Sequence, residues 1–368
     1  MIRTFSNSLH RLGLPALFSV AFTFLFRAIL LSAQTSAPEQ NSGATAALKV
    51  NAELVRIEVS VADKHANLLG GLTQTNFRVL DEGVERPLTF FAPVETPAQI
   101  LVLVETSPAV YLIHRQHLEA AYSLLDGLAP DDQVALATYD QTPRVLLPPT
   151  SDKAALARAL VSLQYNLGMA ELNFYDSVGA ALDSLAALTG KKALVLLTTG
   201  LDSSPPGHWE NLVAKLKASD VVIFPVALGG SLRDADKPKS KSSSRPKSKK
   251  PVENEANNSL GKQQDAVTQR DPELSFERAN NALLSIAQIS GGRAYFPGSA
   301  EDFAPIYREI ASTLRHQYVL GFEPTVHDGR FHSLEIHITD SNGQPMAAAK
   351  SREGYRVYAR QGYLAPAP

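Results

Sequence analysis

The sequence predicts an α/β fold: a mostly parallel β-sheet with helices on both faces, plus a β-sandwich built from strands near both ends of the chain. Residues 100–104 (Ile-Leu-Val-Leu-Val) are too short for a helix and too continuous for a half-exposed strand, so they predict a strand buried on both faces. Strand and helix patterns then alternate up to residue 315, which indicates crossover connections between parallel strands. Outside this part, apolar residues recur with period two, as in antiparallel strands.

Length and composition narrow the class of protein. The chain has 368 residues, enough for about two domains on the usual size prior. Its formal net charge of −2 gives no bulk attraction to nucleic acid, so we expect no nucleic-acid partner. The absence of cysteine excludes disulfides, a thiolate nucleophile and cysteine-ligated metal.

The first 33 residues have the pattern of a signal peptide. Arg3 precedes the apolar stretch 12–31, and small residues including Ala33 follow. Arg27 interrupts the apolar stretch and leaves fewer than the roughly 20 residues that a membrane span needs. We therefore expect export to the periplasm or the extracellular space with cleavage near Ala33. The alternative is an uncleaved anchor, the one case in which we expect membrane contact.

Two stretches of period-two alternation flank the α/β part. A linker of small and polar residues at 34–47 comes first. Apolar and polar residues then alternate over residues 48–97. Within this stretch, the turn Asp-Glu-Gly at 81–83 contains a glycine that can adopt the positive φ of a hairpin, and the hairpin would join residues 76–80 to residues 87–91. Residues 316–364 alternate in the same way. Because each set alone is too short for a secure core, we expect both to join in one sandwich.

The α/β part covers residues 98–228 and 272–315. We expect a first helix after residue 107, a helix from Asp152 with Ser151 as N-cap, and a short strand at 144–147 that Pro148 and Pro149 stop. The remaining expected strands are at 133–139, 193–198, 221–228 and 293–296, and the remaining expected helices lie around 178–189, 209–216, 276–287 and 303–314. Gly190 is expected to end the helix before it.

Residues 229–271 interrupt this pattern with a polar segment that lacks the apolar residues needed for a core, so we expect a disordered insertion. Extending a loop from ~6 to ~40 residues costs only about 2 kcal/mol of closure entropy. The insertion carries seven cations and no acidic residue in its central part: Lys237, Lys239, Lys241, Arg245, Lys247, Lys249 and Lys250. A solvated loop without function and a contact site for an acidic partner both fit this pattern.

Three motifs of the α/β part resemble the von Willebrand factor type A (VWA) domain, a Rossmann-like fold. They are Val-Glu-Thr-Ser at 104–107, Tyr-Asp-Ser-Val at 175–178 and Leu-Leu-Thr-Thr-Gly at 196–200. The flanking stretches 71–83 and 314–322 (Leu-Arg-His-Gln-Tyr-Val-Leu-Gly-Phe) resemble VWFA-related proteins of acidobacterial type. The resemblance extends over roughly residues 50–364.

The resemblance implies a metal-ion-dependent adhesion site at the top of the sheet. In the family, Mg²⁺ is held by Asp-x-Ser-x-Ser, a distant Thr and an Asp, and a partner's carboxylate often completes the shell. The corresponding positions here are Glu105, Ser107, Ala109, Leu172 and Thr199. One carboxylate and two hydroxyls coordinate Mg²⁺ poorly, so we expect a degenerate site with no cofactor, or a weak Mg²⁺ site at most. The alternative is that Glu105 and Ser107 only cap the next helix.

Catalytic patterns are absent from the sequence. The first strand is not followed by a glycine-rich loop, the histidines lack metal-ligand spacing, and the sequence indicates no base beside Ser107. We therefore predict an exported, non-enzymatic, adhesion-type module that binds an unidentified protein or envelope partner through its upper edge. The alternatives are a hydrolase that uses Ser107 or a divalent ion near Glu105, and a purely structural envelope protein. A base within hydrogen-bond reach of Ser107 would favour the hydrolase.

Overall fold

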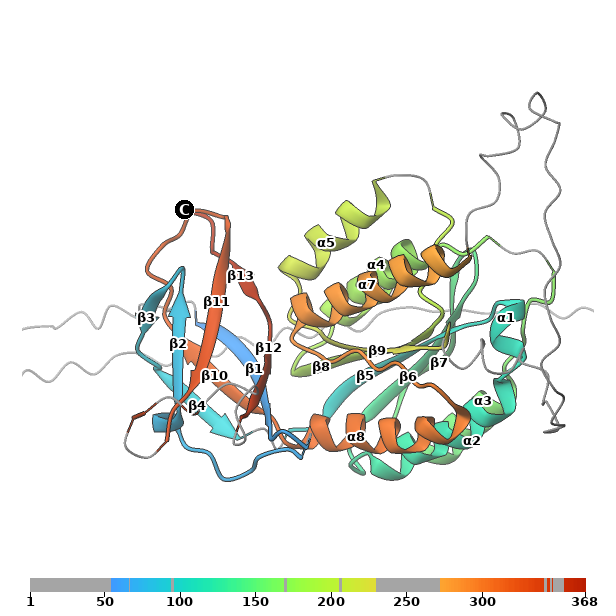
Figure 1. Ribbon diagram of the computed structural model, residues 1–368, viewed down its shortest axis with the longest axis horizontal. Coiled ribbons are helices and arrows are strands. Elements are labelled where there is room, and N and C mark those ends of the chain that lie inside the picture. Colours follow the sequence, from blue (N-terminus) through green and yellow to red (C-terminus); the bar gives the residue numbers. More distant parts are fainter. Residues whose placement is uncertain are drawn as a thin grey trace, which may run out of the picture. The chain divides into compact units, whose positions relative to one another are not determined.

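A five-stranded sheet in the order β7-β6-β5-β8-β9 forms the centre of the α/β part (Figure 1). Its strands are β5 (Ala98–Glu105), β6 (Gln133–Tyr139), β7 (Pro143–Thr150), β8 (Lys191–Thr198) and β9 (Val222–Ala227). β5 lies in the middle and pairs in parallel with both β6 and β8, so that Val102 stands beside Leu136 and Val195. All eight residues of β8 are buried, which explains the continuous apolar run at its residues 193–197. The predicted mostly parallel sheet is confirmed.

The computed structural model describes residues 54–65, 67–93, 96–168, 171–204, 207–229, 272–340, 343–344, 346 and 354–368. The expected signal peptide, linker and basic insertion lie outside these residues. None of the helices in the described part of the chain combines the length and the apolar composition needed to span a bilayer.

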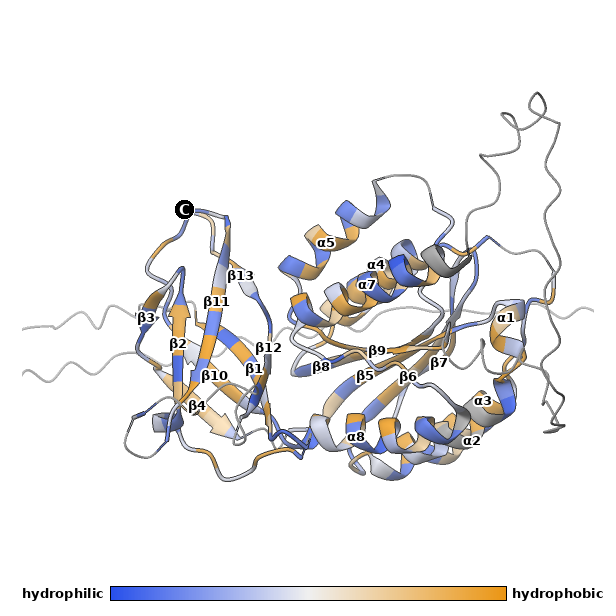
Figure 2. Ribbon diagram, in the orientation of Figure 1, coloured by the Kyte–Doolittle hydropathy of each residue, from blue (hydrophilic) through white to orange (hydrophobic). Residues whose placement is uncertain are grey.

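Helices cover both faces of this sheet (Figure 1). One face carries α2 (His114–Gly127), α3 (Lys153–Val161) and α8 (Phe303–Arg315), and the other carries α4 (Phe174–Ala186), α5 (His208–Ala218) and α7 (Pro272–Ser290). Alternate residues of β5 serve the two layers: Ile100 and Val102 pack toward the first group, and Leu101 and Leu103 toward the second. The apolar sides of the helices accordingly face the sheet (Figure 2).

β7 differs from the expected short strand. It runs through Pro148 and Pro149 and pairs antiparallel with β6 at the edge of the sheet. Its register shifts between Val134 and Ala137 of β6. Prolines are compatible with this place because an edge strand needs hydrogen bonds on one side only and irregularities absorb the missing donors.

Three local predictions about the α/β part are wrong. Asp152, not Ser151, is the N-cap of α3, and its carboxylate accepts hydrogen bonds from the backbone N–H groups of Ala154 (2.8 Å) and Ala155 (3.0 Å). α4 ends at Ala186 rather than at Gly190. Residues 293–296 supply one isolated parallel bridge, between Tyr295 and Val226, instead of a strand.

Strands from both ends of the chain form the predicted β-sandwich. Its two sheets have the orders β12-β1-β10-β4 and β13-β11-β2-β3. The strands are β1 (Val55–Ala62), β2 (Phe77–Asp81), β3 (Val84–Arg86), β4 (Phe90–Pro93), β10 (Tyr318–Phe322), β11 (Phe331–Ile338), β12 (Arg356–Ala359) and β13 (Gly362–Leu364). β1 pairs with β10 on one side and β12 on the other, which confirms that the two ends share one core.

The hairpin after β2 is shorter than expected. Glu82 and Gly83 both have positive φ (50° and 76°), the backbone that a two-residue hairpin turn requires, and they connect β2 to β3. The phenylalanines at 90 and 91 leave this hairpin and pair with β10 in the other sheet. Phe91 stacks on Tyr318 with ring centroids 5.8 Å apart, so aromatic packing across the two strands accompanies this pairing.

A buried carboxylate, Asp81, ties the second sheet together. It accepts hydrogen bonds from Arg86 Nε (3.1 Å) and Tyr363 Oη (3.4 Å), and it contacts His332 Nδ1 at 3.1 Å. The other ring nitrogen of His332 lies 3.3 Å from Asp328 Oδ1. Burial lowers the pKa of His332, but the hydrogen bonds and charges of Asp81 and Asp328 outweigh burial and raise it above its ordinary value.

This cluster predicts a pH-dependent stability of the sandwich. Because the pKa of His332 is higher in the folded than in the unfolded chain, its contribution is complete below the unfolded value of about 6.5 and is lost as pH rises through the folded value. We expect the urea-unfolding free energy to fall as pH rises above about 6.5, and His332→Asn to make this fall smaller. The exposed His337, changed to Asn, is the matched control and should leave it intact. An unchanged pH dependence in His332→Asn would contradict the assignment.

Candidate functional site

The ends of three parallel strands meet at the carboxyl edge of the sheet. Glu105 is the last residue of β5, Tyr139 the last of β6 and Thr198 the last of β8. The parallel register places Glu105 beside Tyr139 and Val104 beside Leu197, so the residues after these strands lie together. This edge carries Glu105, Ser107 and Thr199, three of the residues that the sequence singles out.

The Glu105 carboxylate lies at the centre of this edge and is fully buried. Its Oε1 accepts a hydrogen bond from Ser107 Oγ at 2.6 Å. Its Oε2 accepts one from the backbone N–H of Thr199 at 2.7 Å, and the Thr199 hydroxyl lies 2.8 Å from Oε2 and 3.0 Å from Oε1. The added methylene of glutamate, compared with aspartate, carries the carboxylate across to the turn after β8.

Two further hydroxyls complete the surroundings of Glu105. Tyr139 Oη lies 3.1 Å and Thr198 Oγ1 3.0 Å from Oε2, and these two hydroxyls are 2.6 Å apart. They hold two protons for three contacts, so only two of these contacts are hydrogen bonds at one time. Burial, and secondarily the charge of Glu105, raise the pKa of Tyr139, which keeps its phenol protonated and available as a donor.

Neutral donors therefore surround the Glu105 carboxylate. Among the described residues, no lysine, arginine or histidine forms an ion pair with it. A buried carboxylate needs such hydrogen bonds to offset its desolvation. The described residues also contain no group of three or more acidic or histidine side chains placed to hold a metal ion.

The remaining predicted metal-site positions have different roles. Ala109 lies in the short helix α1 (Pro108–Tyr111), partly buried against the core, and has no side-chain oxygen. The backbone of Leu172 connects two loops, because its N–H donates to Ser203 Oγ (2.7 Å) and its C=O accepts from Ser203 N–H (2.8 Å). The structure thus brings together Glu105, Ser107 and Thr199, while Ala109 and Leu172 supply no side-chain ligand.

The interpretation of Ser107 as a side-chain cap is wrong. Ser107 occupies the N-cap position of α1, but its hydroxyl makes no capping hydrogen bond and donates to Glu105 instead. The carboxylate of Glu105 attracts the hydroxyl more strongly because hydrogen bonds to a charged acceptor are shorter and stronger than those to neutral ones.

A partly exposed rim of mostly aromatic and apolar side chains lies next to this buried centre, and we call it the rim cluster: Tyr111, Leu112, His114, Tyr165 and Leu167, of which His114 and Tyr165 are half-buried. The rings of Tyr111 and His114 stack with centroids 4.6 Å apart, and Tyr165 meets Tyr111 edge-on at 5.6 Å. Leu112 is 66% exposed and Leu167 65% exposed. The backbone N–H of Asn166 donates to the C=O of Thr106 (2.9 Å), which fixes this loop at the strand edge.

Sequence reasoning missed Tyr139, Thr198 and the rim cluster as site residues. Tyr139 and Thr198 could have been found because each ends a strand predicted to neighbour the first one. The signal for the rim cluster was weaker: leucines at 112 and 167 that belong to none of the predicted apolar faces.

The seven basic residues from Lys237 to Lys250 lie outside the described residues. The residues immediately before this segment, up to residue 229, belong to the part of the chain that the structure describes. The backbone N–H of Leu228, which follows β9, donates to the C=O of Thr198 at 2.8 Å. The chain therefore enters the insertion beside Thr198, at the same edge as Glu105.

Comparison with known proteins finds solved structures that are distantly similar to the chain. Solved structures similar to the chain include BatB, a conserved hypothetical protein from Bacteroides thetaiotaomicron (15% identity, 59% of this chain and 98% of that chain, TM-score 0.38). A von Willebrand factor type A protein from Catenulispora acidiphila matches at 10% identity over 85% of this chain and 75% of its own, with a TM-score of 0.41. The vWF domain of the type V pili tip protein Mfa5 from Porphyromonas gingivalis matches at 18% identity over 30% and 40%, with a TM-score of 0.27.

No curated protein matches the sequence. Residues 100–266 match the family model of the von Willebrand factor type A domain. This range begins in β5 and extends through β9, the strands that place Glu105, Tyr139 and Thr198 at one edge. The chain therefore contains a von Willebrand factor type A domain.

Proposed function

We propose that the chain is an exported, non-enzymatic module that binds a protein partner through the upper edge of its VWA domain. The rim cluster carries this proposal. Leu112, Leu167 and Tyr111 expose apolar and aromatic surface around the ends of the strands, and such surface is enriched at the centres of protein interfaces. The sequence of residues 1–33 supports export, which the intact mass of the envelope-localised protein tests.

The hydrolase alternative has one observation in its favour. Glu105 Oε1 lies 2.6 Å from Ser107 Oγ, so a carboxylate base is within reach of the hydroxyl. Access argues against it, because Ser107 is only 3% exposed and Glu105 is fully buried. A substrate carbonyl cannot approach Ser107 without opening this edge. The carboxylate also accepts hydrogen bonds from Thr199, which would have to be given up or shared during proton transfer.

The site residues also argue against Mg²⁺. The hydroxyls of Ser107 and Thr199, which would be cation ligands, point their donors at the Glu105 carboxylate at 2.6–3.0 Å instead. Mg²⁺ requires about six oxygens in near-octahedral array and dehydrates reluctantly. Ala109 and Leu172 offer no side-chain oxygen. We therefore extend the proposal to a degenerate metal site in which the longer Glu105 side chain satisfies by itself the hydroxyls around it.

The degenerate site predicts no stabilisation by Mg²⁺. A ligand at 100 times its Kd adds about 2.7 kcal/mol to the unfolding free energy, which a melting curve resolves easily. We expect the same melting temperature in millimolar Mg²⁺ and in EDTA at matched ionic strength. The combined variant Glu105→Asp, Ala109→Ser, Leu172→Thr and Thr199→Asp restores the family's ligands and should show a Mg²⁺-dependent increase. A Mg²⁺-dependent increase in the unchanged protein would contradict the proposal.

The proposed interface predicts which changes abolish partner binding. Leu112→Asp and Leu167→Asp place charge in the rim cluster and should prevent recovery of the partner from the organism's own envelope extract. Val84→Asp is the matched control, because Val84 is 54% exposed but lies on β3 of the sandwich.

Removal of residues 231–270 should weaken the binding of an acidic partner at low salt and flatten its salt dependence.

The same assay separates the alternatives. If the rim variants and Val84→Asp lose partner binding to the same extent, the interface lies elsewhere on the molecule. Binding that keeps its affinity and salt dependence without residues 231–270 would show that the basic insertion is not part of the interface.

We also propose that the chain is related to VWFA-related proteins of acidobacterial type. The flanking motifs at 71–83 and 314–322 support this relationship.

A further inference from the structure

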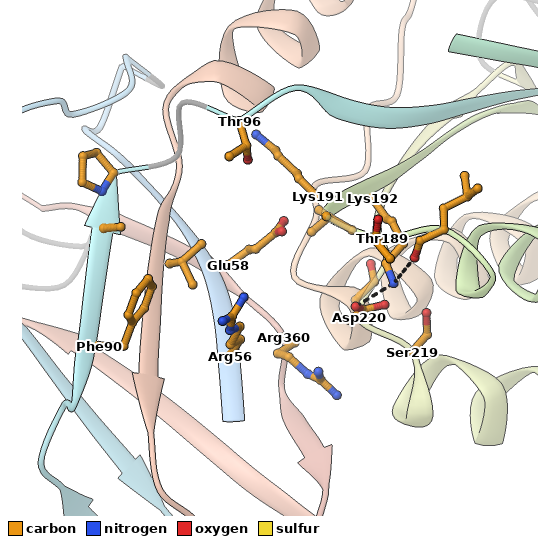
Figure 3. Close-up of a pocket in the computed structure, with 17 residues that line it drawn as sticks. Arg56, Glu58, Phe90, Thr96, Thr189, Lys191, Lys192, Ser219, Asp220 and Arg360 are labelled. Atoms are coloured by element: carbon orange, nitrogen blue, oxygen red, sulfur yellow. Dashed lines mark hydrogen bonds and ion pairs between the residues drawn. The ribbon is translucent and has the colours of Figure 1, made fainter. Parts of the chain in front are cut away.

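A pocket of about 540 Å³ lies far from the Glu105 edge, where the amino ends of β8 and β9 meet the β12-β1-β10-β4 sheet of the sandwich (Figure 3). Pockets for small ligands typically measure about 300–1,000 Å³, so this one has room for a small organic molecule. Apolar walls come from Phe90 and Val319 of the sandwich and from Leu188 and Val222 of the VWA domain. An occupant would therefore contact both parts of the chain.

The strand geometry of β1 aims two charged side chains into this pocket. Ile57 and Val59 face the sandwich core, so Arg56 and Glu58 face the opposite side. Val319 of β10 stands next to Glu58, and Gly321 next to Arg56. The missing side chain at Gly321 leaves space that Phe90 partly fills, and the guanidinium of Arg56 lies 5.5 Å from the centre of that ring. In Figure 3, Glu58 and Arg56 extend toward the space bounded by Lys192, Asp220 and Arg360.

Cations outnumber carboxylates in this pocket. Arg56, Lys191, Lys192 and Arg360 line it, against Glu58 and Asp220. Lys192 and Asp220 form an ion pair of 2.8 Å and neutralise each other. Three lining cations then remain against one carboxylate. Lys191 among them is only 4% exposed, and the guanidinium of Arg360 also donates to the C=O groups of Gly362 and Lys217. Such an excess of partly desolvated positive charge favours an anionic ligand.

Glu58 is the unusual group of the pocket. It is partly buried as a residue, but its Oε2 atom is fully buried and has no hydrogen-bond partner among the described residues. Burial raises its pKa to about 7, although the charge of Lys191 opposes this. Lys191 itself donates to the C=O of Leu314 at the end of α8, and burial lowers its pKa to about 8. Near neutral pH, Glu58 can therefore carry a proton and act as a donor.

We propose that this pocket binds a small organic anion, a carboxylate or phosphate with an apolar body, held by Arg56, Lys191 and Arg360 and by a hydrogen bond from protonated Glu58. Where Glu58 is ionised in the free protein, binding takes up one proton from solvent at its carboxylate; where it is already protonated, no proton is taken up, and in both cases the Glu58 O–H donates a hydrogen bond to the ligand oxygen. The competing occupant is a cation that pairs with ionised Glu58. The two occupants predict opposite pH dependences, because the first needs Glu58 protonated and the second needs it charged.

Calorimetric titration of the full chain with six-carbon probes tests this proposal. Hexanoate and hexyl phosphate are the anionic probes and distinguish carboxylate from phosphate recognition; hexylammonium and hexanol are the cationic and neutral comparisons. The charge of hexanoate is constant between about pH 6 and pH 8, so the pH dependence is measured with it. We expect hexanoate to bind about 10- to 20-fold more weakly at pH 8 than at pH 6, because protonated Glu58 becomes about tenfold scarcer and charged Lys191 about twofold scarcer.

Substitutions separate a binding role from a structural one. Glu58→Gln keeps a neutral donor at every pH, so its affinity for hexanoate should fall only about twofold between pH 6 and pH 8, as Lys191 loses part of its charge. Arg56→Met should weaken binding at both pH values, and the exposed Glu335→Gln on β11 should change nothing. Tighter binding of hexylammonium, an affinity for hexanoate that rises with pH, no binding of either anion, or loss of binding in a folded Glu58→Gln variant would each overturn the proposal.

Discussion

A single buried carboxylate, that of Glu105, determines how the upper edge of the VWA domain is organised. It receives contacts from hydroxyls or backbone after three strands: Ser107 after β5, Tyr139 of β6, and Thr198 and Thr199 at the end of β8. A buried charge without such donors would cost several kcal/mol, so the strand ends must keep their positions for the carboxylate to stay buried. The hydrogen bonds of Glu105 thereby link the ends of these three strands.

Packing below the edge supports this arrangement. Gly200 adopts a φ of +71°, and a Cβ at this position would lie 3.0 Å from Leu283 Cδ1 and 3.2 Å from Ala279 Cβ of α7. The backbone can therefore turn tightly against α7, which directs the N–H of Thr199 to Glu105 and that of Gly200 to the Thr198 hydroxyl. The apolar layer and the polar edge depend on each other. Leu112 and Leu167 of the rim cluster stay largely exposed beside them.

The sequence was sufficient for the architecture because periodicity and strand order are local signals. The buried run at 100–104, the alternation of strands and helices and the two flanking β segments all recur in the structure. Predictions that depended on distant contacts were less accurate. Residues 90–91 pair with β10 rather than with β2, and Ser107 donates to Glu105 rather than capping α1, because both outcomes depend on groups remote from the local pattern. Period-two alternation likewise showed only that Glu58 faces away from a core, not that it faces a pocket.

The unfolding free energy of Glu105→Gln tests the central claim most directly. The amide keeps the shape of the side chain but replaces one acceptor oxygen by a donor, which would face the hydroxyls of Ser107 or Thr199. We expect a loss of roughly 2–4 kcal/mol in chemical denaturation, as for other buried hydrogen-bond networks. Thr199→Val should lower the unfolding free energy by less in the Glu105→Gln variant than in the unchanged protein, because residues 105 and 199 interact directly. A Glu105→Gln protein as stable as the unchanged one, with additive effects of Thr199→Val, would contradict the account.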